Sequence, residues 1–244
     1  MRLELSGEDR VRQQLLDLAS QTPKQANYAT AVALTRTAQL IRTGARQVMQ
    51  GRFDRPTPYT LNSIYVRGAT RSNLTALVNI KDESYKSAPA SRWLRAEIDG
   101  GERHQKRSEK LISRLGLGNF MTPADAPKDG FGNVNRGFIV KMLSGMKAMG
   151  EQGYMANRTK GKRSQRKARN FDIFAGNPDG MGPGIWQRVA LGHGTGLKPL
   201  MWLHDSAPQY RAVFPFEKIA ENIYRARFST QLERAIAKAL ATAR

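Results

Sequence analysis

The sequence of 244 residues lacks cysteine, has only three histidines, and holds half as many acidic as basic residues. The absence of cysteine excludes disulfides, thiolate nucleophiles and cysteine-ligated zinc sites. The histidines, at positions 104, 193 and 204, are too scattered to form a recognisable metal-binding motif. No stretch approaches the roughly 20 apolar residues that a membrane span needs. The first residues also lack the apolar segment of a secretory signal peptide. We therefore expect a protein that uses no membrane, metal or other cofactor.

Positive charge is the dominant property of the composition. Forty Lys and Arg residues against twenty Asp and Glu residues give a formal net charge of +20, while 40% of the residues are apolar and can form a core. A surface this positive repels itself, and it indicates a polyanion or an acidic partner nearby. Paired carboxylates for acid–base chemistry are scarce: the candidates Glu97/Asp99 and Glu8/Asp9 are better explained as surface and helix-capping residues. The sequence therefore predicts that the protein is not an enzyme.

The hydrophobic pattern changes period along the chain and predicts an α+β fold. Apolar residues at steps of three and four predict long helices over residues 6–22, 24–52 and 216–243. The stripe of the second helix is narrow and rich in alanine, which permits close packing against another helix. Alternating apolar residues predict antiparallel strands within residues 60–80 and 171–203. We expect an antiparallel sheet flanked by the long N- and C-terminal helices.

The middle of the chain is expected to contain extended loops or arms, at residues 81–135 and 151–170, within a single structural domain spanning residues 1–244. Inside these limits, residues 102–115 have the composition of a basic helix, while residues 116–135 are rich in Gly, Pro, Asp and Asn and are expected to form a loop. A further helix is expected from Arg136 to Met149.

The large aromatic residues gather in the last third of the sequence. Because such side chains bury the largest areas, we expect them to form one core where the strands meet the last helix. These residues are Trp186, Trp202, Phe214, Phe216 and Phe228.

A basic segment, residues 158–169, stands out because it contains seven cations and no acid. The cations are Arg158, Lys160, Lys162, Arg163, Arg166, Lys167 and Arg169. The segment cannot bury itself, since each charge would need a partner that the segment does not contain. Three interpretations stay open: an arm that contacts DNA phosphates without sequence preference, an arm that docks on an acidic protein surface, and a solvated loop that only aids solubility.

Two glycine-containing motifs are better explained as turns than as ligand sites. Residues 192–196 (GHGTG) lack the Lys-Ser/Thr of a phosphate-binding loop and do not open a helix. The sequence around Asp129-Gly130 faintly resembles a calcium loop, but Phe131 occupies a ligand position and no closing glutamate follows.

Several stretches resemble the Z-type minor tail proteins of tailed bacteriophages, which are also described as tail-completion or neck proteins. The resemblance lies in the texture and order of the stretches over most of the chain, except residues 102–170. The stretches are residues 3–9 (LELSGED), 29–38 (ATAVALTRTA), 52–61 (RFDRPTPYTL), 184–186 (GIW), 200–203 (LMWL), Tyr210 and the helix 216–239.

The resemblance implies a virion structural protein at the head–tail junction, with no catalytic residue. It implies a homo-oligomeric ring around the DNA channel that joins tail to head and meets other neck, portal (connector) or tail-tube proteins. Phage DNA would be contacted through its backbone alone, and we expect the basic segment to become ordered only on assembly. The main alternative is a stand-alone nucleic-acid-binding protein without sequence preference.

Overall fold

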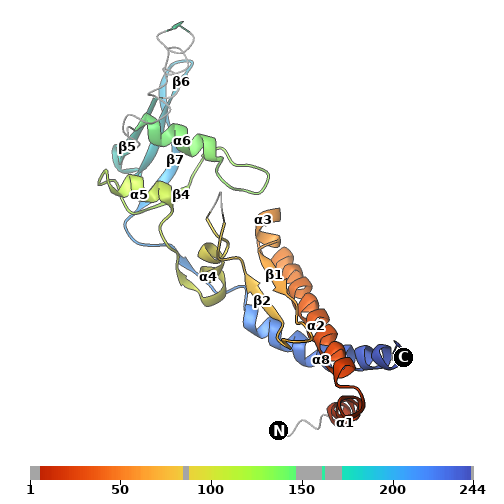
Figure 1. The fold of residues 1–244 in the computed structure, drawn as a ribbon. Helices are drawn as coiled ribbons and strands as arrows, with labels where there is room; N and C mark the ends of the chain where they lie inside the picture. Colours follow the sequence, from red (N-terminus) through yellow and green to blue (C-terminus); the bar gives the residue numbers. More distant parts are fainter. Residues whose placement is uncertain (1–5, 85–87, 147–160, 163–171, 243–244) are drawn as a thin grey trace. The chain divides into compact units, whose positions relative to one another are not determined.

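The computed structural model describes residues 6–84, 88–146, 161–162 and 172–242 (Figure 1). Its contacts divide the chain into two compact units. Unit 1 consists of Met1–Gly100 together with Arg211–Arg244, and unit 2 consists of Gly101–Tyr210. Helices and antiparallel strands are both present, which confirms the α+β class. The single structural domain stays a prediction.

Unit 1 is built around three helices: α1 (Ser6–Gln21), α2 (Pro23–Arg52) and α8 (Phe216–Thr242), which confirms the three long helices expected. Pro23 begins α2, at the position where a proline's missing N–H is no loss. Small side chains let the helices approach closely, because α2 contributes mainly alanines to their common core. The buried residues of this core are Val11, Leu18, Ala26, Ala29, Ala33, Leu232, Ala235, Ile236 and Ala239.

A second core of unit 1 lies between the C-terminal half of α2 and a β-hairpin. Strands β1 (Ile64–Arg67) and β2 (Leu77–Ile80) pair antiparallel, as expected from the alternation. The short helices α3 (Pro58–Leu61) and α4 (Ser91–Asp99) complete this part. The buried residues of this core are Ala45, Met49, Ile64, Ala90, Leu94 and Phe214.

Unit 2 is organised by a four-stranded antiparallel sheet in the order β4-β7-β6-β5. The sheet strands are β4 (Phe120–Pro123), β5 (Asp172–Gly176), β6 (Gly184–Leu191) and β7 (Gly194–His204). The remaining elements are β3 (Gly101–Glu102), α5 (Arg107–Ser113), α6 (Arg136–Gly145), the 3₁₀ turn η2 (Pro178–Gly180) and β8 (Gln209–Tyr210). The buried core joins α5 and α6 to the sheet through residues such as Ile112, Met142 and Ile185.

Residues 81–101, expected to be loop or arm, contain the helix α4, so that expectation is wrong there. Two further expectations for the middle of the chain are wrong in detail. Residues 116–135 are not only loop, since β4 lies within them and pairs with β7. Residues 102–115 form a helix only at Arg107–Ser113, because residues 101–102 pair with residues 209–210 as β3 and β8. In both cases a short segment finds a strand partner about eighty or more residues away, which short-range periodicity cannot reveal.

The expected aromatic core is also wrong. Trp186 and Trp202 pack edge-to-face in unit 2, with ring centroids 5.5 Å apart, whereas Phe214 is buried in unit 1 beside Phe216. Phe228 packs against the core of the three long helices. The physical reason is that α8 buries its apolar face on α2, while the sheet is covered by α5 and α6.

Candidate nucleic-acid interface

The basic segment lies mostly outside the described residues. Lys162 is described and is exposed. Outside them lie Arg158, Lys160, Arg163, Arg166, Lys167 and Arg169. The proposed contact of these cations with DNA or a neighbouring protein therefore stays a prediction. A different basic surface lies among the described residues.

Helix α2 carries such a surface, because none of its 30 residues is acidic. At about 100° per residue, four of its five cations fall within an arc of about 120° around the helix axis. These four are Lys24, Arg36, Arg42 and Arg46. Arg36 is half-buried and the other three are exposed. Arg52, also exposed, falls outside the arc. Every charged residue within this arc of α2 is thus a cation, although uncharged side chains such as Tyr28 and Val32 share it.

A groove opens on this basic side, between α2 and the loop that joins β1 to β2. Its volume is about 380 Å³. It is lined by Tyr28, Ala31, Val32, Thr35, Arg36, Gln39, Ala69, Thr70 and Arg71. No acidic residue lines it, and the polar lining consists of guanidinium, hydroxyl and amide groups.

Specific contacts fix the loop against the helix. The backbone N–H of Ala69 donates a hydrogen bond to Thr35 Oγ1 at 3.0 Å. Gly68 lies so close that a Cβ atom there would be 3.1 Å from the Thr35 side chain, so the close approach favours glycine. The Arg71 guanidinium lies over the Tyr28 ring, 5.0 Å from its centroid. Local turns, including Thr70 N–H to Asn73 O at 2.8 Å, shape the loop itself.

The two arginines of the groove differ from other cations of the chain in their ion pairing. Within the part of the chain that the structure describes, neither Arg36 nor Arg71 forms an ion pair with a carboxylate. Arg225 of α8 differs, because it pairs with Glu221 one turn away. Two guanidinium groups facing one groove repel each other, and an anion between them would relieve that repulsion.

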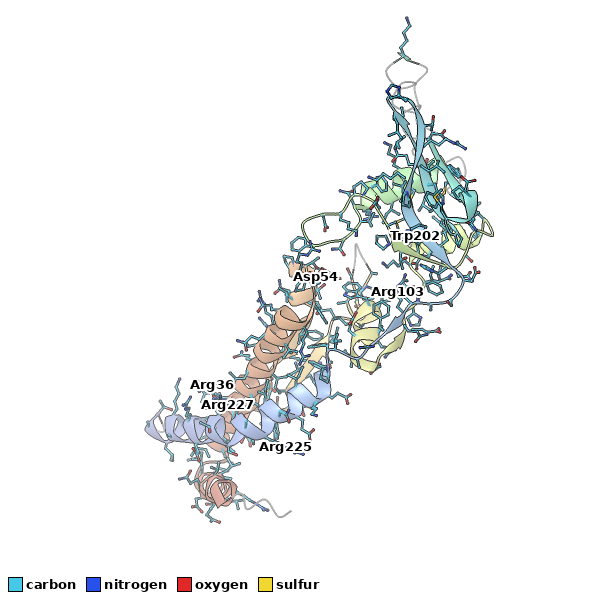
Figure 2. The ribbon with its side chains drawn as sticks, turned by 180° about the vertical axis from the view of Figure 1, so that it is seen from behind. Arg36, Asp54, Arg103, Trp202, Arg225 and Arg227 are labelled. Carbon is cyan, nitrogen blue, oxygen red and sulfur yellow. The ribbon has the colours of Figure 1, made fainter. Side chains whose placement is uncertain are left out.

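Helix α8 exposes the cations expected from its sequence, Lys218, Arg225, Arg227, Arg234 and Lys238. Figure 2 shows Arg36 on α2, and Arg225 and Arg227 on α8. Unlike α2, however, α8 also carries three glutamates, so its surface charge is mixed. One expected member of its buried stripe, Leu240, is 54% exposed, because Ala239 takes the buried position.

A buried ion pair lies in unit 2, between Arg103 and Glu109. The Glu109 carboxylate accepts hydrogen bonds from the Arg103 guanidinium and from the backbone N–H groups of Lys106 (2.7 Å) and Met121 (3.0 Å). Burial favours the neutral acid, but these hydrogen bonds and the Arg103 charge outweigh it, so the pKa of Glu109 is lowered. The pair ties α5 to β4. The partners that the described residues supply all lie within unit 2, so we interpret the arrangement as structural. Sequence reasoning missed it because nothing in the sequence distinguishes Arg103 from the other cations.

The other candidate sites behave as turns or isolated side chains. Residues 192 and 193 form the two-residue connection of the β6–β7 hairpin, which confirms the predicted turn there, whereas residues 194–196 belong to β7. Asp129 Oδ1 accepts hydrogen bonds from the backbone of Phe131 and Asn133, which confirms the second predicted turn. Glu97 is half-buried rather than a surface residue, and burial raises its pKa. Among the described residues, no three His, Cys, Asp or Glu side chains gather as metal ligands would.

Comparison with known proteins adds no relative. No family model, curated protein or solved structure matches this chain. Separately, none of the described helices combines the length and apolar character needed to span a bilayer.

Proposed function

We propose that this chain is a structural subunit of a tailed-phage particle that contacts DNA through phosphates at the head–tail junction. It assembles as a ring around the DNA channel and joins the tail to the head. The resemblance of its sequence to Z-type tail-completion proteins suggests the location at the head–tail junction. The observation that carries the contact with DNA is the acid-free basic side of α2 with its groove.

The distribution of charge supports a polyanionic partner. Clustered arginines without acidic partners raise the local positive potential, and DNA carries one negative charge for about every 1.7 Å of duplex. Contacts to phosphates alone are blind to sequence. A channel subunit needs contacts of this kind, because the DNA must later leave.

Exposed apolar surface supports assembly with other subunits. Leu16 on α1 and Leu240 on α8 are each 54% exposed. A groove of about 300 Å³ between these two helices is lined by Leu18, Ile236, Ala237 and Leu240, with Gln14, Asp17 and Glu233 at the same groove. Apolar surface of this kind is commonly covered by a partner.

The deciding experiment is to locate the subunit in the intact particle by electron microscopy, together with the mass of the purified oligomer. We expect density at the head–tail junction and a cyclic oligomer. A monomer that is absent from every particle would refute the proposal.

Deletion of residues 158–169 tests the role assigned to the basic segment. We expect particles carrying the deletion to fail in joining heads to tails or in ejecting DNA. A matched control keeps the segment at full length with its seven cations replaced by glutamine, which separates charge from length. If both variants join and eject normally, the segment has no such role.

The alternative, a stand-alone nucleic-acid-binding protein, is favoured by the same basic side of α2. It predicts tight DNA binding by the isolated chain, with an affinity that falls steeply as salt rises. A neck subunit should bind DNA weakly alone and associate with portal or tail-tube proteins.

A further inference from the structure

We propose that the groove between α2 and the β1–β2 loop is a binding site for a phosphodiester group of a DNA strand, with Arg36 and Arg71 as its donors. This inference rests on the function proposed above and names the site at which DNA is held. It also separates this site from the basic segment at residues 158–169.

The donor set fits an anion with several acceptor oxygens. A guanidinium offers several N–H donors in a planar fork that matches phosphate geometry. Arg36 comes from the helix and Arg71 from the loop, so the two forks reach the groove from opposite walls. Thr70 and Gln39 add a hydroxyl and an amide to the same lining.

The electrostatic cost of the empty groove also favours binding of an anion. Arg36 is half-buried and has no carboxylate partner among the residues that the structure describes. A partly desolvated charge is costly until it meets an opposite charge. Elsewhere in the chain the sequence supplies that charge internally, as Glu109 does for Arg103.

The groove is also prepared for its ligand before binding. Stacking on the Tyr28 ring restricts the Arg71 side chain, and the hydrogen bond from Ala69 to Thr35 holds the loop on the helix. Less side-chain freedom is then lost on binding, which favours affinity.

The surroundings favour a polymer over a free anion. Arg42 and Arg46 continue along the same side of α2, and the ten residues from Arg36 to Arg46 span about 15 Å. One DNA strand places roughly four phosphates along that distance. A strand whose phosphate enters the groove would therefore meet further cations as it follows the helix.

The test measures binding of the full chain to three probes by fluorescence anisotropy or competition. The probes are a labelled DNA duplex of about 20 base pairs, an oligothymidylate of about 20 nucleotides and inorganic phosphate as competitor, in salt from about 20 to 200 mM. The variants are Arg36→Gln and Arg71→Gln. The matched control is Arg52→Gln, which removes the same charge from an exposed position on α2 outside the groove and the basic arc. Thermal unfolding checks that each variant folds.

We expect Arg36→Gln and Arg71→Gln each to weaken DNA binding about five- to tenfold, and Arg52→Gln by less than about twofold. Each groove variant should also lower the magnitude of the salt slope by about 0.9 on duplex or about 0.7 on single-stranded DNA. The larger loss on one of these two probes identifies the form of DNA that the groove accepts.

Three results would overturn the groove as a phosphodiester site. They are groove variants that behave like Arg52→Gln, a chain that binds neither DNA probe at about 20 mM salt, and full displacement of bound DNA by inorganic phosphate at a concentration equal to that of the DNA phosphates, which would make the groove a site for a free anion. None of these results bears on where the subunit lies in the particle, so microscopy tests the function proposed above independently.

Discussion

Replacing Glu109 by glutamine removes one charge of a buried ion pair while keeping nearly the same side-chain size. The Glu109 side chain is 1% exposed and that of Arg103 is 9% exposed. Glutamine presents an amide in place of one carboxylate oxygen. The N–H₂ group must then face either the Arg103 guanidinium or a backbone N–H, which are donors themselves. The substitution therefore leaves a guanidinium in a largely dry environment without its counter-charge.

Breaking a buried pair by removing one partner typically costs about 3–5 kcal/mol. Arg103 keeps slight contact with solvent, and its guanidinium lies over the Phe120 ring at 5.3 Å. We therefore expect the lower part of that range, about 3 kcal/mol, in the free energy of unfolding of unit 2. The matched control is Asp172→Asn, which removes a carboxylate from the Arg188–Asp172 pair of the same unit. Both side chains of that pair are 49% exposed, so we expect a loss below about 1 kcal/mol.

Tryptophan fluorescence during urea denaturation reports on this unit, because Trp186 and Trp202 both lie in it. Trp93 lies in unit 1 and is replaced by phenylalanine in all variants, so that the signal comes from one unit. A loss for Glu109→Gln no larger than that for Asp172→Asn would refute the reasoning, since burial would then contribute nothing.

The same pair predicts a pH dependence. The pKa of Glu109 is lowered in the folded chain relative to its ordinary value of 4.5. The unfolded chain therefore takes up the proton first as the pH falls, and the stabilisation present above pH 4.5 is lost as the pH falls through the folded pKa. The difference in stability between wild type and Glu109→Gln should shrink below pH 4.5. A difference that stays constant down to acid unfolding would contradict this.

Three further predictions concern α2. Thr37 is 1% exposed and its hydroxyl has no hydrogen-bond partner among the described residues, so Thr37→Val should raise the free energy of unfolding by about 1 kcal/mol. The control is Thr30→Val, because the Thr30 hydroxyl donates a hydrogen bond to a backbone carbonyl at 2.9 Å. Equal effects of the two substitutions would contradict the prediction. Gly44 faces the tip of the Ile223 side chain, so Gly44→Leu should cost about 1–3 kcal/mol in urea denaturation. A Cβ atom at Gly51 would meet no other atom within 4 Å, so Gly51→Ala should raise the free energy of unfolding by about 0.5–1 kcal/mol. If Gly44→Leu costs no stability, α2 and α8 can move apart at this contact and the prediction is wrong.

The long helices and the hairpin could be predicted because their signals are local. Proline at position 23 separates two runs of helical period, and the period changes to two at Ile64. The strand β4 could not be predicted, because four residues in a glycine- and proline-rich stretch become a strand only by pairing with β7. Local pattern thus determined the elements with many internal contacts and missed those stabilised by distant partners.

The sequence predicted a basic surface for a polyanion, but it did not predict that α2 and the β1–β2 loop would form one. Excess charge directed attention to residues 158–169, whereas the groove joins Arg36 and Arg71, which are 35 residues apart. One feature of the sequence could have indicated the α2 wall of the groove: the 30 residues of α2 contain no acid. The loop wall depends on the contact between Ala69 and Thr35, which no spacing rule predicts.

Unit 1 draws its helices from both ends of the chain, and this has a consequence for synthesis on the ribosome. About 160 residues separate the end of α2 from the start of α8, so at about 5–20 residues per second roughly ten to thirty seconds pass between them. Unit 2 is continuous in sequence, but its strand β7 ends only twelve residues before α8 begins. The alanine face of α2 lacks its partner during the whole interval. Alanine side chains expose little apolar surface during this interval, so the alanines of α2 also limit aggregation of the nascent chain.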